Sequence, residues 1–505
     1  MANKISIELL MMILNNVQSP RSTQDLFSSL LVNRIWCRVT IPILWELPFG
    51  QECTMDDTKL RKRALCIRTY ISCMDTQART LLTQNGYDLS SSPPQAAFDY
   101  PSFAHKFGTD NLIYFISVYS QQIIGSDQDN DNDDYNNKSR ILFREICKLI
   151  LNRCSFLDYF KLAGVSKIFF RNFSNYSDLI GLIPKLPDTP KVLKKLETFV
   201  LVKVNDDELI KPLYESLALI CDDILNMDLQ FISHQYPQLL PEFISAQKRL
   251  ENLSIAHSEL PIPMFCAIIS QKETLESLRL KSVNFHQLEG ESSPTGEFVS
   301  LQKLYIANCT GLDNSNCLSL ASSFTQLSNF HCYHSLYNSI SYPQEFIIKI
   351  LETANANLKH IFLNLYLPIP SDIFTAILNS CTMVTKLTLH DISIEQVIAI
   401  FNNNFNELTR FSFDYNGLDA NKLLCQMAES VPVSLETLVI RMGIFNADSL
   451  RKFFEGWCCE GGAGNKKIIV KRTEQARLFK LSDEHLEVIE EYGIPNQLLQ
   501  THNSS

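Results

Sequence analysis

Apolar residues recur in one fixed frame along more than half of this chain. In LQKLYIANC, which begins at Leu301, they stand at the first, fourth and sixth positions, and a cysteine stands at the ninth. The frame occurs eleven times, with first residues at Leu157, Leu196, Ile224, Leu250, Leu275, Leu301, Leu327, Leu358, Val384, Leu408 and Leu435. Eight of the ten distances between successive first residues are 24 to 28 residues long. Chance would not hold this spacing over so many copies, so the chain is predicted to be a stack of similar units.

The frame also predicts the local structure of each unit. Alternate side chains of a strand point to opposite faces, so the frame residues face the stack and the residues between them face outward. A unit leaves its frame residues exposed until a neighbour covers them, and burying each leucine contributes ~1.5–3 kcal/mol. The pattern resembles the leucine-rich repeat, which implies an α/β solenoid shaped like a horseshoe. Its parallel strands would line the concave face over residues 141–475, with KKIIVKR near residue 466 as a degenerate last copy.

The outward strand residues are the predicted contacts for a bound protein. A curved array presents them as one broad surface, on which Tyr, Phe and Arg are typical binding residues. The other interpretation of each one is a solvated strand residue without a partner. The predicted target-binding residues are Glu276, Arg279, Lys303, Tyr305, His331, His360, Phe362, Lys386, Thr388, Arg410 and Ser412.

The first 45 residues carry more apolar side chains than so short a segment can bury by itself. Ser6 can cap a helix from residue 7 to about residue 15 or 16, and a second helix is predicted to begin after residue 22 or 23. A third element over 33–40 is predicted to end before Pro42, because the residue ahead of a proline disfavours helix. The remaining apolar surface must then pack on the rest of this chain or on a partner.

The order of motifs in this segment resembles an F-box. The matching residues are Glu8, Leu9 and Leu10 for its first helix, Asp25 and Leu26 for the start of its second, Val32, Arg34 and Trp36 for its core, and Trp45 for its closing tryptophan. Ser6 stands where that family usually has a proline that contacts the adaptor subunit. The match covers residues 5–45, which is less than a tenth of the chain.

An F-box segment followed by leucine-rich repeats is similar to the F-box/leucine-rich-repeat proteins, including the large fungal sets of them. The resemblance implies a substrate-recognition subunit of an SCF-type ubiquitin ligase, which binds a Skp-type adaptor, and through it a cullin, by its N-terminal segment. The adaptor-binding residues that it implies are Ile7, Leu10, Ile13, Leu14, Leu31, Val32, Trp36 and Trp45. One alternative is a leucine-rich-repeat scaffold without a ubiquitin-ligase role, whose N-terminal helices are only a cap. Another is an enzyme of an unrecognised class.

The predicted domains are an N-terminal segment over 1–48, a helical linker region over 49–140, the array over 141–475 and a tail over 476–505. Within the linker, GSDQDNDNDDYNNKS (125–139) has five aspartates and no aliphatic residue, which predicts a disordered loop. A calcium loop of the EF-hand type is the alternative. It would need a glycine at the sixth position and a glutamate at the twelfth, and this stretch has neither.

Composition and missing motifs narrow the function classes. The net charge of −10 argues against a nucleic-acid partner, and no apolar run reaches the ~18 residues of a membrane helix. The fifteen cysteines form no paired CxxC motifs, so no metal site is predicted and a reducing, cytoplasmic or nuclear compartment is expected. Phosphate-loop, G-x-S-x-G and H-E-x-x-H motifs are also missing, so we expect neither catalysis nor a cofactor.

Overall fold

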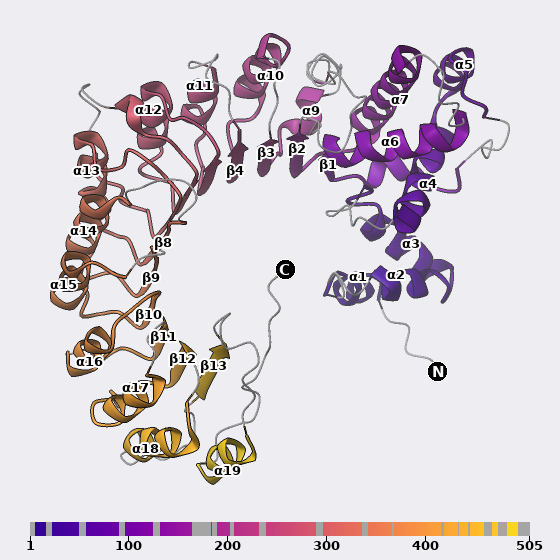
Figure 1. Ribbon diagram of the computed structural model, residues 1–505. Helices are drawn as coiled ribbons and strands as arrows, with labels where there is room; N and C mark the ends of the chain where they lie inside the picture. Colours follow the sequence, from indigo (N-terminus) through magenta and orange to yellow (C-terminus); the bar gives the residue numbers. More distant parts are fainter. Residues whose placement is uncertain are drawn as a thin grey trace. The chain divides into compact units, whose positions relative to one another are not determined.

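The chain divides into two compact units, residues 1–250 (unit 1) and residues 251–505 (unit 2). The computed structural model describes residues 6–16, 23–49, 57–89, 96–124, 132–163, 183, 189–202, 207–231, 239–288, 296–335, 342–365, 368–403, 405–415, 419–432, 434–442, 445–458, 467–472 and 482–492. Figure 1 shows how the elements follow one another within each unit.

Unit 1 begins with helices and continues with alternating strands and helices. Its helices are α1 (Ile7–Asn16), α2 (Thr23–Leu30), α3 (Arg34–Leu44), α4 (Asp57–Cys73), α5 (Thr76–Gln84), η1 (Tyr100–Phe103), α6 (Thr109–Ile124), α7 (Asn132–Arg153), α9 (Thr189–Leu193), α10 (Asp207–Ile220) and α11 (Leu239–Ser245). Its strands are β1 (Lys106–Gly108), β2 (Tyr159–Ala163), β3 (Thr198–Val202) and β4 (Asn226–Gln230). The strands pair in parallel in chain order.

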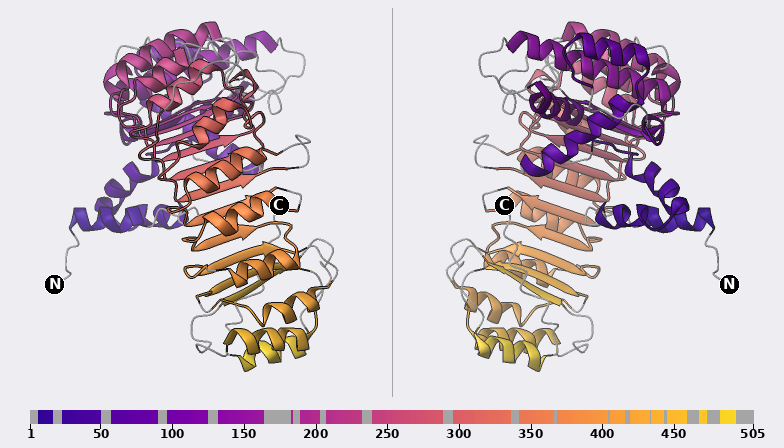
Figure 2. Two further views of the ribbon diagram at one scale, coloured as in Figure 1. Left: turned by 90° about the vertical axis from the view of Figure 1, so that its left-hand side faces the viewer. Right: turned by 90° about the vertical axis from the view of Figure 1, so that its right-hand side faces the viewer.

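Unit 2 alternates strands and helices throughout. Its strands are β5 (Asn252–Ala256), β6 (Ser277–Lys281), β7 (Lys303–Ala307), β8 (Asn329–Tyr333), β9 (His360–Asn364), β10 (Lys386–Leu389), β11 (Arg410–Asp414), β12 (Thr437–Met442) and β13 (Lys467–Arg472). Its helices are α12 (Ile262–Ser270), η3 (His286–Leu288), α13 (Ser315–Ala321), α14 (Gln344–Thr353), α15 (Ser371–Ser380), α16 (Ile394–Asn402), α17 (Ala420–Met427), α18 (Ala447–Cys458) and α19 (Asp483–Glu491). The strands again pair in parallel in chain order, and Figure 2 shows helices along one side of them.

The predicted frame explains this architecture. Each of the eleven frames forms one strand, and the second frame residue of a strand pairs with that of the next, as Phe160 does with Phe199 and Leu278 does with Leu304. All frame residues are at most 3% exposed. The prediction of an α/β stack of parallel strands is therefore confirmed, because each strand buries its frame residues against its neighbours.

The turn that follows a strand is also repeated. Among the residues that the structure describes, five non-glycine residues have a φ between 51° and 55°, and they are Phe231, His257, Ser282, Asn308 and Asp391. Each lies two residues after the third frame residue of its strand. A positive φ is uncommon for residues with a side chain, so its recurrence at one position shows that these repeats share the same backbone path.

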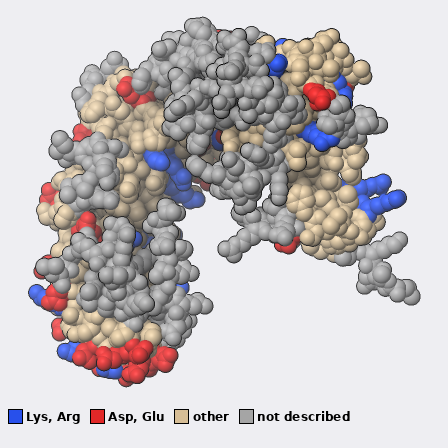
Figure 3. Space-filling model, turned by 45° about the vertical axis from the view of Figure 1, so that its right-hand side comes forward, with Lys and Arg blue, Asp and Glu red and all other residues tan. Residues whose placement is uncertain are grey.

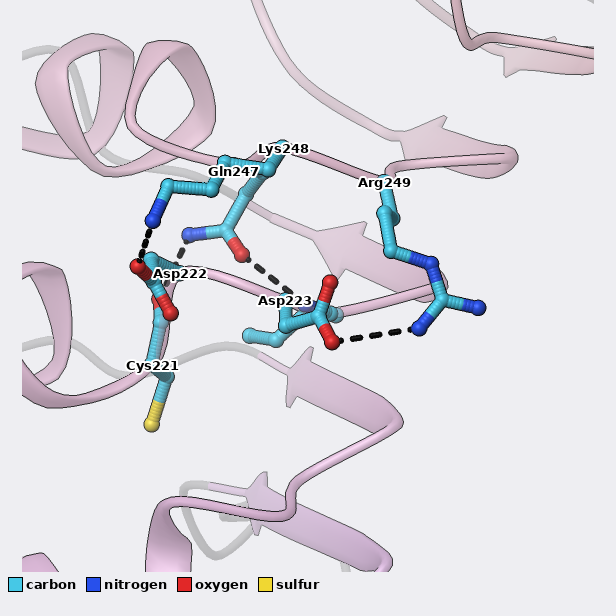
Figure 4. A network of polar contacts seen from close by, with 7 residues as sticks. Cys221, Asp222, Asp223, Gln247, Lys248 and Arg249 are labelled. Carbon is cyan, nitrogen blue, oxygen red and sulfur yellow. Dashed lines mark hydrogen bonds and ion pairs between the residues drawn. The ribbon is translucent and has the colours of Figure 1, made fainter.

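Buried polar contacts join neighbouring repeats of unit 1 at the turn before a strand (Figure 4). The Gln247 side chain is buried, donates hydrogen bonds of 2.8 Å to the carbonyls of Cys221 and Phe243, and accepts one of 3.1 Å from the Ile224 N–H. The adjacent Lys248 forms an exposed ion pair with Asp222 of the preceding repeat. Because solvent weakens exposed ion pairs, the buried amide carries most of the stabilisation at this junction.

Two predictions about helices in the N-terminal half need correction. Helix α3 does not end before Pro42 but continues to Leu44, and the Trp45 N–H still bonds the Ile41 carbonyl at 3.0 Å. The acidic loop is shorter than predicted because α7 begins at Asn132, and its residues 125–131 lie outside the described residues. In both places packing of nearby apolar residues, such as buried Ile41 in α3 and Leu142 in α7, favours helix over the local sequence preference.

The strand array also begins earlier than predicted, inside the region 49–140. Strand β1 pairs with β2, and Phe107 in β1, with Ala104 before it and Thr109 just after it, occupies the positions of a frame. All three are fully buried, and the Thr109 hydroxyl accepts a hydrogen bond of 3.0 Å from the Ala163 N–H. Because Ala104 and Thr109 stand where other copies have large apolar residues, the sequence pattern did not predict this copy. The predicted tail 476–505 contains α19, which packs on α18 through Phe454 and a tyrosine ring; residues 476–481 and 493–505 lie outside the described residues.

Candidate functional site

The first three helices enclose a small core of their own. Ser6 caps α1 by accepting the Leu9 N–H at 3.2 Å, and the Asn33 side chain caps α3 by accepting the Ile35 and Trp36 N–H groups at 2.9 and 3.0 Å. The buried core residues are Leu10, Leu14, Leu26 and Val39, with Trp36, Ile43 and Leu44 packed against them. The caps and this core give the segment a defined shape.

The outside of the same three helices is unusually apolar. Among the described residues of the whole chain, fourteen large apolar side chains are exposed, and nine of them lie here. These nine residues, which we call the N-terminal apolar surface, are Ile7, Leu9, Met11, Met12, Ile13, Phe27, Leu31, Val32 and Ile35. Leu31 is 88% exposed. Such a concentration of apolar side chains on a small segment is typical of a surface that another protein covers.

The structure divides the predicted adaptor-binding residues into two groups. Ile7, Ile13, Leu31 and Val32 lie on the N-terminal apolar surface, whereas Leu10 and Leu14 are 2% exposed within the segment's own core, and Trp36 is half-buried against it. Trp45 faces the rest of unit 1, with its ring 4.4 Å from that of Tyr100 and 5.5 Å from that of Tyr70. Sequence reasoning missed the exposure of Leu9, Met11, Met12, Phe27 and Ile35, because an apolar helix in sequence does not reveal which side it buries.

A polar junction adds to the rings that join this segment to β1. The Glu46 carbonyl accepts the N–H groups of His105 and Lys106 at 3.1 and 3.0 Å, and its carboxylate pairs with the Lys106 ammonium at 2.6 Å. Burial lowers the pKa of Lys106, but the hydrogen bond and charge of Glu46 outweigh it and raise that pKa overall. The segment is therefore fastened to unit 1 at the end of α3, away from α1 and α2.

A second surface lies on the open face of the unit 2 sheet, by which we mean the face away from the helices. Among the outward strand positions whose side chains the structure describes, seven carry Lys or Arg, namely Arg279, Lys281, Lys303, Lys386, Arg410, Arg441 and Lys467. The one acidic residue at these described positions is Asp414. Figure 3 shows a group of Lys and Arg side chains on the strand side of unit 2, and acidic side chains gathered at its C-terminal end. The chain has a net charge of −10, so this face differs from the average surface.

Rings from consecutive strands form a continuous row on this face. The Arg279 guanidinium lies 5.2 Å from the centre of the Tyr305 ring, and that ring lies 6.3 Å from His331. His331 stacks on Phe362 with centres 5.5 Å apart and planes 15° apart, and Phe362 meets His390 edge to face at 5.4 Å. We call these five residues the ring row. The row exists because the outward residues of paired strands fall in register.

The row ends in a charged group. His390 Nδ1 lies 2.6 Å from Asp414 Oδ2, and that oxygen accepts a hydrogen bond of 2.9 Å from the Arg441 guanidinium. Asp414 is therefore engaged by two neighbours. In contrast, no ion pair of Arg279, Lys303, Lys386 or Arg410 is found within the described part of the chain.

Two histidines of this face, His331 and His360, have a pKa below the ordinary value. Burial, and then the charge of Arg279, lower the pKa of His331. Burial also lowers the pKa of His360, and the charge of Lys386 lowers it further. Lysine and arginine, rather than these two histidines, therefore supply positive charge on the open face at neutral pH.

The open face brings together ten of the eleven predicted target-binding residues. Arg279, Tyr305, His331, Phe362, Thr388 and Ser412 occupy one register position of β6 to β11, and Lys303, His360, Lys386 and Arg410 occupy the position two residues earlier. Glu276 lies just before β6, where its carbonyl accepts the N–H groups of Gln302 and Lys303. Sequence reasoning missed His390, Asp414 and Arg441, because contact between them depends on strand register and on a residue beyond the end of β10.

The chain was compared with known protein families and curated proteins, and its described residues were searched for metal-ligand groups and membrane-spanning helices. No protein-family model matches the sequence, and no curated protein is similar to it. No group of three or more His, Cys, Asp or Glu residues in the described ranges has the arrangement of a metal site. None of the helices that the structure describes is long and apolar enough to cross a membrane.

Proposed function

We propose that this protein is a non-catalytic substrate-recognition subunit of an SCF-type ubiquitin ligase, of the F-box/leucine-rich-repeat type. The N-terminal apolar surface would bind a Skp-type adaptor, and through it a cullin, while the open face of unit 2 would bind the target protein. Such a receptor raises the concentration of its target near the enzyme that transfers ubiquitin. The proposal places the protein in the cytoplasm or nucleus, where this machinery works.

The observation that carries the proposal is the concentration of exposed apolar side chains on α1 to α3. A helical cap that served only to cover unit 1 would bury its apolar face and expose a polar one. Here the segment already has its own core, and the described contacts that fasten it to the rest of unit 1 come from the end of α3, Trp45 and Glu46. The apolar residues that remain outside are thus available to a partner.

The test is capture of a purified Skp-type adaptor by the full chain and by two charge variants. Leu31 and Leu219 are both 88% exposed, but Leu219 lies on α10, outside the N-terminal apolar surface. We expect Leu31→Glu to abolish capture and Leu219→Glu to leave it unchanged, because a buried unpaired charge opposes docking. Equal capture by both variants, or none by the unaltered chain, would reject the adaptor role and favour a scaffold whose N-terminal helices only cap the array.

Surface variants are preferable to a deletion. Removal of residues 1–45 would also remove Trp45, whose ring packs on Tyr70 and Tyr100, and it would expose the buried Tyr70. Loss of capture by that deletion would therefore mix loss of a docking surface with damage to unit 1.

A further inference from the structure

The open face of unit 2 combines two groups of cations with a central group of rings. Arg279, Lys281 and Lys303 come from β6 and β7, and Lys386 and Arg410 come from β10 and β11. Neighbouring strands lie about 4.8 Å apart, so the two groups are separated by about 14 Å, or three strand spacings between β7 and β10. The ring of Tyr305 lies on β7 itself, and the rings of His331 and Phe362 lie on β8 and β9, the two strands between the groups.

The rings present their edges. His331 and Phe362 stack on one another, and the face of Tyr305 is covered by the Arg279 guanidinium, so neighbouring side chains already occupy these ring faces. The edge of an aromatic ring is electropositive and its face electronegative. The row therefore offers positive edges between two groups of positive side chains.

We infer that this face binds an extended, Asp- and Glu-rich segment of the target protein, with acidic residues at the two cation groups and a shorter contact on the ring edges between them. The inference rests on the proposed function, whose target-binding site it specifies. A gap of about 14 Å corresponds to about four residues of extended chain at ~3.3 Å per residue. The acidic positions of the bound segment are therefore about four residues apart.

Two features favour a peptide over a nucleic acid. Single-stranded nucleic acids bind by stacking bases on open aromatic faces, and the ring faces of this row are taken by their neighbours. The net charge of −10 also repels a long polyanion, whereas a short acidic segment contacts only the local cations.

The experiment is selection of a random peptide library on the full chain, followed by affinity measurement with labelled selected peptides. The test variant combines Lys386→Glu with Arg410→Glu. A matched control combines Lys422→Glu with Lys452→Glu, which makes the same charge change on exposed residues of α17 and α18. We expect peptides enriched in Asp and Glu, and an affinity about tenfold lower for the test variant at low salt, because each exposed charge pair changes binding a few-fold.

The control variant is expected to bind as the unaltered chain does. Phe362→Leu keeps an apolar side chain but removes the ring edge, and we expect it to weaken the same peptides while leaving adaptor capture intact. Selected peptides without acidic enrichment, equal binding by both double variants, or displacement of the peptides by single-stranded DNA at lower concentration would overturn the inference. Adaptor capture uses other residues, so its failure is a separate result.

Discussion

The buried amide of Gln247 provides the sharpest test of what holds neighbouring repeats together. In Gln247→Met the side chain keeps its size, so little cavity forms, but Ile224 loses the acceptor of its buried N–H. An unpaired buried donor costs ~1–3 kcal/mol, and each of the two carbonyl partners contributes ~0.5–1.5 kcal/mol. The carbonyls are those of Cys221 and Phe243. The expected loss is about 2–6 kcal/mol in local stability.

Hydrogen exchange of residues 221–230 in the full chain measures this loss directly. A loss of about 2 kcal/mol or more accelerates exchange through local opening by about 30-fold or more. Lys248→Met is the control, because it changes the next residue and removes an ion pair whose side chains are 71% and 50% exposed. If both variants exchange at the same rate, the assignment of stability to the buried amide is wrong.

Other predictions concern packing, protonation and thiol reactivity. In Gly456→Ala the new Cβ would lie 1.9 Å from the backbone oxygen of Ala428, the residue after α17, so we expect a loss of about 1–3 kcal/mol or more in thermal unfolding. Gly296→Ala meets only the flexible end of a lysine at 3.1 Å and should be nearly neutral. Because burial lowers the pKa of His331, the unfolded chain binds its proton more tightly; stability should fall as pH drops below about 6.5, and a shallower fall of the melting temperature in His331→Gln is the check. Burial raises the pKa of Cys309 to about 12, so mass spectrometry should find this thiol unalkylated in the native chain after the half-buried Cys37 has reacted, and the opposite order would contradict its burial.

Sequence reasoning located the array because burial imposes a strict rule on it. Every frame residue must be apolar to be covered by its neighbours, so the pattern was legible from Leu157 to Ile440. Strand β1 escaped because Thr109 satisfies its hydroxyl with a hydrogen bond to β2, which no residue pattern announces. Helix α19 escaped because its sequence is mostly acidic and its burial depends on contact with α18.

The candidate surfaces were predictable only in part. Alternation along a strand identifies outward residues such as Tyr305 and Phe362, but it does not say that their rings touch. That depends on register between strands about 26 to 31 residues apart in the chain. Likewise, an apolar helix such as α1 shows its outer side only when the positions of α2 and α3 are known. Contacts between separate elements are the information that a local pattern lacks.

The joint at Trp45 has a mechanical consequence. Its ring packs on those of Tyr70 and Tyr100, and Glu46 is bonded to the start of β1. A segment joined by a flexible linker would allow a bound partner to adopt many orientations. Here the last turn of α3 is held against the first strand, so a partner bound to α1 and α2 would keep a fixed orientation relative to the rest of unit 1 and would move with it as a rigid body.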